Sequence, residues 1–230
     1  MARTDAYAGS RRSGVPLMSD SLINTHRDGA CLTVVVNRPA KANSLTSGML
    51  NALRDIFCAA AEDEELRALI LTGAGDRVFC AGADLNTLYD ETGGPDPWTE
   101  MAEALHAVPV LTLAAINGPC MGGGLTLALG CDVRICVPEA RFAYPVLKNN
   151  VLPGQYDMDR LQALVGPGRA ATILLGGETV SASDAVAWGL ADRMVNRGAL
   201  EDTCLALCET AMAADGAHLK TLKSMLGRVV

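Results

Sequence analysis

Residues 110–125 read Val-Leu-Thr-Leu-Ala-Ala-Ile-Asn-Gly-Pro-Cys-Met-Gly-Gly-Gly-Leu, an apolar run that ends in a glycine-rich turn. The uncharged run from Val110 to Ile116 has the length and composition of a buried strand. The triple glycine at 122–124 then opens a short apolar helix, which we expect over 125–129. Glycine at such a junction lets the backbone turn tightly and lets a ligand approach the main chain. The stretch therefore predicts a strand, a turn and a helix N-terminus.

Strand and helix patterns alternate on both sides of this stretch. Segments 31–36, 68–72 and 132–137 read as strands, and apolar residues recur at helical spacing after Thr46, a typical N-cap residue. We expect the chain beyond 137 to be helical. The alternation predicts the α/β class. With 230 residues, half of them apolar, we expect one domain over 21–230, after a disordered leader at 1–20 and with a short C-terminal helical region from about 198.

Composition and charge exclude several classes of function. The formal charge is −7 and the basic residues are scattered, which does not suit nucleic-acid binding. The eight cysteines form no CxxC pair, and no signal peptide precedes them, so we expect reduced thiols in a cytoplasmic protein. No uncharged apolar run approaches the roughly 18 residues of a membrane span. No His, Cys and Asp cluster has metal-ligand spacing, so no metal site is expected.

A second glycine-bearing segment, Phe-Cys-Ala-Gly-Ala-Asp-Leu at 79–85, follows the strand at 68–72. The first N–H groups of a helix are unpaired and favour negative charge, so Gly123 offers one donor. A free N–H of Ala83 would complete a two-donor cradle for a developing oxyanion. Taken alone, the triple glycine could equally serve close helix–sheet packing. The dinucleotide fingerprint and the phosphate loop are excluded because their remaining residues are missing.

These motifs together resemble those of the enoyl-CoA hydratase/isomerase (crotonase) family. The resemblance covers about 22–226 and rests on Asn-Arg-Pro at 37–39, Ala-Gly-Ala-Asp-Leu at 81–85, Asn-Gly at 117–118, the triple glycine and Cys-Asp at 131–132. It implies a crotonase-like spiral of β-β-α units with two sheets at a steep angle and C-terminal helices. It also implies homotrimers or hexamers that bind acyl-CoA. Coenzyme A would be part of the substrate, so no separate cofactor is expected.

The resemblance also implies which residues contact acyl-CoA. The N–H groups of Ala83 and Gly123 would form the oxyanion hole. The nucleotide end of the ligand would lie near Lys41, Ala42 and Asn43. The remaining expected substrate contacts are Ala81, Gly82, Asp84, Leu85, Gly122 and Tyr144. Asp84 could instead hold the loop backbone.

The chain departs from the family pattern at the residues that transfer protons. Hydratases of the family carry one glutamate two residues after the triple glycine and another twenty residues later; here these positions are Thr126 and Val146. Valine cannot transfer a proton, and threonine is too weak an acid to replace a tuned glutamate. Asp157 is the nearest candidate for a replacement acid. We favour the other interpretation of Asp157, a carboxylate at a helix N-terminus that faces water.

Three functions remain open. The first is an enzyme that stabilises a thioester enolate without ordinary hydration, by decarboxylation, isomerisation or a lyase step. The second is a non-catalytic fatty acyl-CoA binding or carrier protein. The third is a structural relic without a ligand. We lean to the enzyme. The apolar stripe of a late helix could serve assembly or could equally be ordinary core; its members are Leu200, Cys204, Leu207, Cys208 and Ala211.

Overall fold

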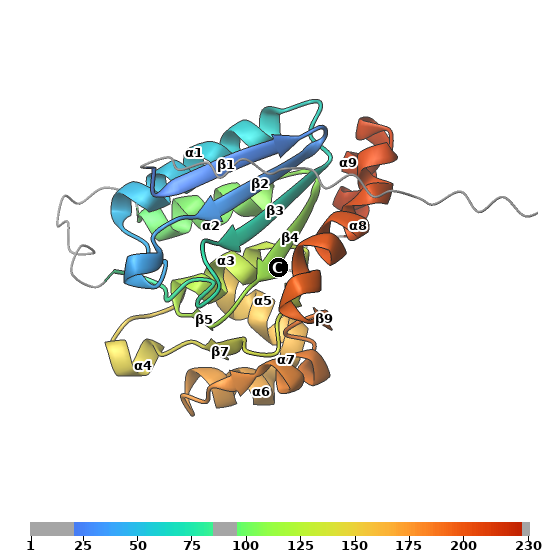
Figure 1. Ribbon diagram of the computed structural model, residues 1–230. Helices are drawn as coiled ribbons and strands as arrows, with labels where there is room; N and C mark the ends of the chain where they lie inside the picture. Colours follow the sequence, from blue (N-terminus) through green and yellow to red (C-terminus); the bar gives the residue numbers. More distant parts are fainter. Residues whose placement is uncertain (1–20, 85–95, 227–230) are drawn as a thin grey trace, which may run out of the picture.

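A computed structural model describes residues 21–84 and 96–226 of the chain (Figure 1). The leader predicted at 1–20 and the predicted contact Leu85 lie outside the described residues. The buried apolar side chains form one hydrophobic cluster that includes residues of both sheets and of most helices. The α/β class and the presence of two sheets are confirmed.

The larger sheet has six strands in the order β1-β2-β3-β4-β6-β9. They are β1 (Ile23–Asp28), β2 (Cys31–Val36), β3 (Ala68–Gly73), β4 (Leu111–Ile116), β6 (Val133–Cys136) and β9 (Arg193–Met194). All neighbours run parallel except β1 and β2, which form an antiparallel pair. The central strands β3 and β4 are apolar and almost wholly buried, as expected for parallel strands covered on both faces.

The smaller sheet has three strands in the order β5-β7-β8. They are β5 (Cys120–Met121), β7 (Arg141–Ala143) and β8 (Val180–Ser181). The expectation that the chain is helical beyond 137 was therefore wrong at β7, β8 and β9. Strands of two or three residues are too short to show a periodicity of two.

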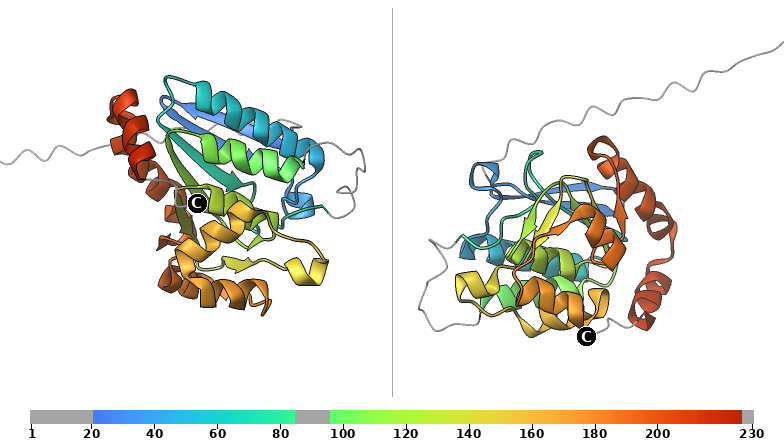
Figure 2. Two further views of the ribbon diagram at one scale, coloured as in Figure 1. Left: turned by 180° about the vertical axis from the view of Figure 1, so that it is seen from behind. Right: turned by 90° about the horizontal axis from the view of Figure 1, so that it is seen from below.

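Helices surround the sheets and make up most of the C-terminal half. They are α1 (Ser47–Glu62), α2 (Pro97–Ala107), α3 (Gly123–Gly130), α4 (Val146–Asn149), α5 (Gln155–Val165), α6 (Pro167–Leu174), α7 (Ala182–Trp188), α8 (Leu200–Ala213) and α9 (Gly216–Met225), with short 3-10 turns at Pro39–Lys41 and Arg197–Ala199. The side-chain oxygen of Thr46 accepts a hydrogen bond from Met49 N and caps α1, as predicted. Helices α1 and α2 lie side by side on one face of the larger sheet (Figure 2).

The late-helix stripe lies in α8, which packs against β3, β4 and β6. Four of its five members are buried, whereas Leu207 is 38% exposed. The structure thus supports the core interpretation of this stripe. Helix α9 is anchored by Lys223, whose ammonium donates to the carboxylate of Asp132 at 2.7 Å and to the carbonyl of Val110.

Arg134 in β6 is a fully buried cation, 1% exposed. Its guanidinium donates to the carboxylate of Asp192 at 2.8 Å and to the carbonyls of Leu190 and Cys131 at 2.9 and 2.8 Å. A buried charge is tolerated only when it is paired and hydrogen-bonded. These bonds join the segment before β9 to β6 of the larger sheet.

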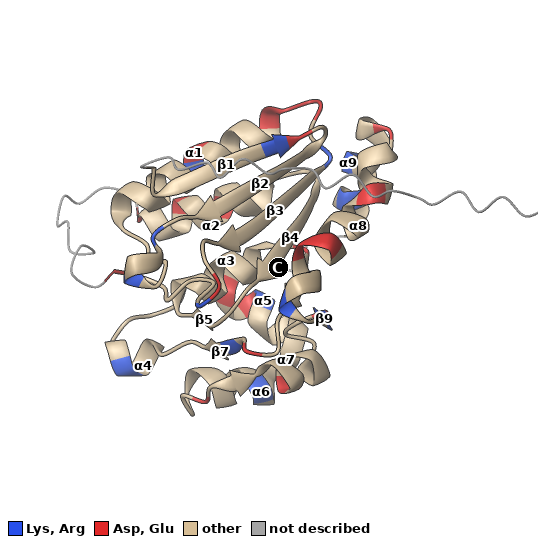
Figure 3. Ribbon diagram, viewed as in Figure 1, with Lys and Arg blue, Asp and Glu red and all other residues tan. Residues whose placement is uncertain are grey.

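Acidic and basic residues are interspersed over the elements in the view of Figure 3. Basic residues do not gather there into a continuous stripe. Across 21–84 and 96–226, no helix combines the length and the apolar composition that crossing a membrane requires.

Candidate functional site

The two glycine-bearing segments pack directly against each other. Cys80 and Cys120 pair as an isolated parallel bridge, and Met121 N donates to the carbonyl of Cys80 at 2.9 Å. One residue further on, Gly122 N donates to the carbonyl of Ala143 at 2.9 Å, at the end of β7. The loop after β3, the loop after β4 and the smaller sheet therefore meet at the N-terminus of α3.

Glycine is required at the contact between these loops. Gly82 has φ +92°, and a β-carbon there would stand 2.9 Å from Gly123 N and 2.8 Å from the carbonyl oxygen of Met121. Gly122, the N-cap of α3, has φ +53° and ψ −122°, a conformation that side chains disfavour. A β-carbon on Gly124 would stand 2.4 Å from the carbonyl oxygen of Cys80. The triple glycine therefore brings two backbones together, which larger residues would prevent.

The hydrogen bonds around Ala83 determine where its N–H points. Leu45 N donates to the carbonyl of Gly82, and Asp84 N donates to the carbonyl of Leu45, both at 2.8 Å. Leu45 and Ala83 form a parallel bridge. In such a bridge Leu45 bonds to the two neighbours of Ala83, and the N–H of Ala83 itself is directed to the side away from Leu45. The N–H of Ala83 thus points away from Leu45, to the edge on which Gly82 packs against Gly123. Ala83 and Gly123 are both half-buried.

Trp98, near the start of α2, covers Gly123. The ring carbon Cη2 of Trp98 lies 2.1 Å from the point at which a β-carbon on Gly123 would stand. The indole therefore rests directly on the glycine backbone, at the first turn of α3. Neither α2 nor Trp98 was predicted from the sequence.

A buried carboxyl group lies one helical turn further along α3. Oδ2 of Asp157, in the first turn of α5, accepts hydrogen bonds from Thr126 Oγ1 at 2.6 Å and from Tyr144 Oη at 2.5 Å. The two hydroxyl oxygens lie 3.0 Å apart, so the three groups form a closed triangle. All three residues are at most 8% exposed. Oδ1 of Asp157 is buried and has no hydrogen-bond partner among the described residues.

Burial dominates the titration of this triangle. It raises the pKa of Asp157, and the hydrogen bonds from Thr126 and Tyr144 oppose the rise only in part. Burial and the neighbouring carboxylate also raise the pKa of Tyr144, so its phenol stays protonated. Asp157 is therefore the group in the triangle that gains or loses a proton first, at a pH above the usual range of an aspartate.

The favoured expectation for Asp157, a helix carboxylate that faces water, was wrong. The side chain is 3% exposed and points into the molecule. Asp157, Leu161 and Val165 form the buried face of α5 at a spacing of four residues. This spacing is visible in the sequence, and it could have indicated that Asp157 lies on the inner face.

The other predicted contact residues differ in their exposure to solvent and in the hydrogen bonds of their side chains. Lys41, beside Ala42, is exposed to solvent. Ala81, in the neighbouring loop, is also exposed. The side chain of Asn43 is 1% exposed; its amide donates to the carbonyls of residues 74 and 78, and its Oδ1 accepts from the backbone N of residue 38. Asn43 therefore holds the loops together. The carboxylate of Asp84 forms an ion pair with the guanidinium of Arg38 at 2.7 Å, in accordance with a loop-holding role.

The position expected for the second glutamate holds an apolar side chain in a dry environment. Val146 begins α4 and is 5% exposed. It contacts the hydrophobic cluster of the core. Its side chain offers no group that could bind or move a proton.

Cysteine side chains near the glycine loops are not reactive nucleophiles. Burial raises the pKa of Cys80 to about 12 and moves that of Cys120 upward as well. Since the thiolate is the nucleophilic form, both residues act as small apolar groups in this packing.

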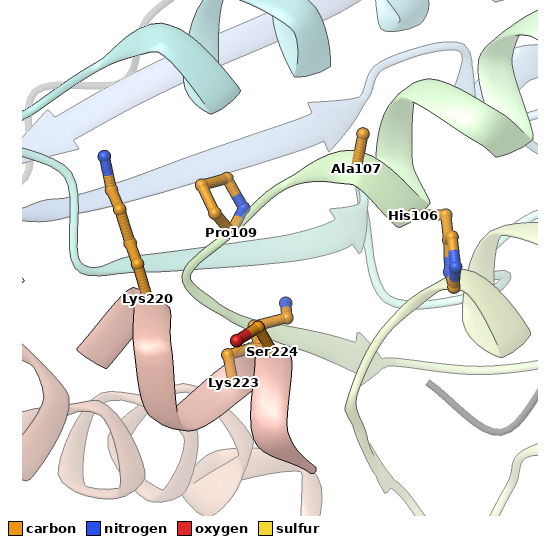
Figure 4. Close-up of a pocket in the computed structure, with 6 residues that line it drawn as sticks. All are labelled: His106, Ala107, Pro109, Lys220, Lys223 and Ser224. Carbon is orange, nitrogen blue, oxygen red and sulfur yellow. The ribbon is translucent and has the colours of Figure 1, made fainter. Parts of the chain in front are cut away.

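A surface hollow of about 370 Å³ lies between the end of α2 and α9 (Figure 4). Its lining residues are His106, Ala107, Pro109, Lys220, Lys223 and Ser224. None of the predicted site residues lines it. His106, which lines the hollow, also forms a hydrogen bond with Tyr156, whose Oη lies 2.8 Å from Nδ1 of the imidazole. Within the described ranges, no group of three His, Cys, Asp or Glu side chains could hold a metal ion.

Substituting Gly124 tests the contact between the loops. Gly124→Ala should destabilise the protein by about 1–3 kcal/mol, the usual cost of overpacking, because the new methyl group meets the backbone of Cys80. Gly168→Ala is the matched control: no atom lies within 4 Å of its added β-carbon, and alanine favours the helix by up to about 1 kcal/mol. Urea unfolding measures both variants. Equal stability changes in the two would contradict the close contact.

Comparisons with known proteins agree with this geometry. The model of the enoyl-CoA hydratase/isomerase family matches residues 26–230. A probable enoyl-CoA hydratase of Mycobacterium leprae is 39% identical over 174 residues, which are 74% of this chain and 69% of that protein. A carnitinyl-CoA dehydratase of Proteus mirabilis is 34% identical over 200 residues, 84% of this chain and 74% of that protein.

Solved structures show the same architecture. An enoyl-CoA hydratase/carnithine racemase from Magnetospirillum magneticum superposes with a TM-score of 0.83 at 29% identity, covering 91% of this chain and 81% of that one. Pseudomonas aeruginosa DspI superposes with a TM-score of 0.83 at 31% identity, covering 93% of this chain and 83% of that one. The predicted crotonase fold is confirmed, and the chain belongs to the enoyl-CoA hydratase/isomerase family.

Proposed function

We propose that this protein binds acyl-CoA thioesters and stabilises a thioester enolate through the N–H groups of Ala83 and Gly123. The observation that carries the proposal is the direct packing of the two glycine loops, which brings Gly82, the neighbour of Ala83, against Gly123. The negative charge of an enolate oxygen is favoured at the N-terminus of α3, where backbone N–H groups are unpaired. Removing one such donor from an oxyanion hole typically costs about 2.7–4 kcal/mol.

The rest of the ligand would follow the loop after β3. The acyl and pantetheine path would run along Ala81, Gly82 and Asp84, beside Gly122. Lys41 is an exposed cation next to this loop and suits the phosphates of the nucleotide end. The backbone of Ala42 accepts a hydrogen bond from Ala81 N at 3.0 Å, which joins the two parts of the path.

The reaction we propose is one of enolate chemistry without ordinary hydration. Hydration needs one group to activate water and another to deliver a proton. The two positions that carry glutamates in hydratases hold Thr126 and a buried Val146. The same observation favours an alternative, a non-catalytic fatty acyl-CoA binding or carrier protein. A cytoplasmic location, trimeric or hexameric assembly and the lack of a further cofactor stay predictions.

Calorimetric titration with butyryl-, octanoyl- and palmitoyl-CoA tests the binding. Saturable binding is expected for at least one of them, and free coenzyme A should bind more weakly because it offers no thioester oxygen. Gly82→Ala should weaken acyl-CoA binding by about tenfold, or 1.4 kcal/mol, because the added methyl group crowds Gly123 N. Gly168→Ala should bind as the wild type does. An absence of saturable binding to all three thioesters would refute the proposal.

A further inference from the structure

We propose that Asp157, held by Thr126 and Tyr144, is the proton-transferring carboxyl group of this chain, acting on the carbon next to the thioester carbonyl. The inference rests on the proposed function, since it requires acyl-CoA at the loops around Ala83 and Gly123. It assigns a role to a residue that lies outside the positions at which the hydratases of the family carry their glutamates.

The first argument is position. Thr126 follows Gly123 by three residues in α3, so both lie on one helix face, and helical side chains tilt toward the N-terminus. The hydroxyl of Thr126 therefore points toward the turn that would hold the enolate oxygen. Asp157 Oδ2 lies 2.6 Å from this hydroxyl. The carboxyl group is thus brought from α5 to the place where a hydratase would carry its first glutamate.

The second argument is the hydrogen-bonding pattern of the carboxyl group. Both hydroxyl groups donate to Oδ2, whereas Oδ1 has no partner in the described part of the chain although it is buried. A buried polar atom without a partner is costly and calls for an explanation. A purely structural carboxyl would be expected to use both oxygens. We assign proton exchange with the ligand to this unpartnered Oδ1.

The third argument is the electrostatic environment. Helix α3 carries no titratable side chain, and Tyr144 is the titratable group that faces Asp157 from the end of β7. On α5 itself, Asp159 and Arg160 follow, and His106 of α2 bonds to the adjacent Tyr156. No charged side chain contributes to the pKa of Asp157, which burial raises. Both protonation states are therefore accessible nearer neutral pH than for a solvated aspartate.

The proton transfer balances without a further reactant. The carboxylate of Asp157 takes a proton from the carbon next to the carbonyl; the C–H electron pair becomes the C=C bond of the enolate, and the carbonyl oxygen takes the negative charge. In the reverse step the carboxylic O–H bond breaks, a new C–H bond forms and the carbonyl returns. The hydroxyl groups of Thr126 and Tyr144 stabilise the carboxylate form of Asp157, which is present before the proton is removed and after it is returned.

Hydrogen–deuterium exchange at this carbon tests the inference. Wild-type protein incubated with butyryl-CoA in D₂O should incorporate deuterium faster than a protein-free sample, as followed by mass spectrometry. Asp157→Asn should slow the exchange by about 10²–10⁴-fold, the usual contribution of a positioned acid or base, with the Kd for butyryl-CoA unchanged. Asp159→Asn, two residues further along α5, is the matched control and should exchange at the wild-type rate.

A second variant separates proton transfer from a structural role. The exchange rate should rise with pH as Asp157 ionises, because the carboxylate is the form that removes the proton. Tyr144→Phe removes a hydrogen bond that lowers the pKa of Asp157, so the midpoint of this profile should move to higher pH. A residue that only supports the fold would leave the midpoint unchanged.

The outcomes distinguish the two proposals. Binding of butyryl-CoA without exchange, exchange that survives Asp157→Asn, or an unmoved midpoint in Tyr144→Phe would each overturn the role of Asp157 and leave the acyl-CoA site standing. An absence of acyl-CoA binding in the wild type would overturn the proposed function itself. If Asp157→Asn fails to fold, the Tyr144→Phe profile decides.

Discussion

Crotonyl-CoA should be hydrated by the wild-type protein at least about 10²–10⁴-fold more slowly than by a hydratase that has both carboxylates. One positioned acid or base contributes about this factor, and Asp157 can replace at most one of the two. Val146 leaves its side of the site apolar, and the hydroxyl of Thr126 already donates to Asp157. The loss of enoyl absorbance measures the rate. Turnover at a rate ordinary for hydratases would refute the interpretation of both positions.

A gain-of-function variant is the control for this result. Thr126→Glu with Val146→Glu should produce hydration if the loops around Gly123 hold the thioester as proposed. The new carboxyl at 126 would meet Asp157, which now lies 2.6 Å from the side chain there. Two carboxylates at such a distance cannot both ionise. Asp157→Asn should therefore be included, and the double variant without it should gain less activity.

Arg134→Ala is expected to destabilise the fold by about 2–5 kcal/mol, the range of large-to-small substitutions in a core. The substitution leaves a cavity and removes the donors to the carbonyls of Leu190 and Cys131. Arg134→Met is the control that keeps most of the volume; it should cost about 1–3 kcal/mol for the unsatisfied carbonyls alone. Chemical denaturation measures both. A smaller loss for alanine than for methionine would contradict this account.

The sequence predicted the central strands and the first helix closely, because their patterns are long and consistent. Segment 31–36 is β2, and Thr46 caps α1 as predicted. The edge strand β1 was missed, because Ile23–Asp28 is polar and mostly exposed and so shows no alternation. Sequence patterns report burial, so an element that buries little on either face leaves no signal.

The candidate site was predicted only in part, because some of its features follow from local motifs and others from the packing of distant helices. Glycines at strand–helix junctions are local signals, and they indicated the two loops that the structure brings together at Gly82 and Gly123. The triangle of Thr126, Tyr144 and Asp157 depends on the packing of α5 against α3, which no local motif encodes. A polar residue on the inner face of an amphipathic helix could have been recognised from the positions of its apolar neighbours, but its partners could not.

The indole that covers Gly123 gives the protein an intrinsic optical probe. The chain has two tryptophans, and the other, Trp188, lies in α7 with the guanidinium of Arg169 at 5.4 Å from its ring. The ring of Trp98 lies against Gly123, one of the two residues whose N–H groups are proposed to hold the thioester oxygen. Occupancy of the site and the surroundings of this fluorophore are therefore linked. The emission of a Trp188→Phe protein would follow the arrival and departure of unlabelled ligands in real time.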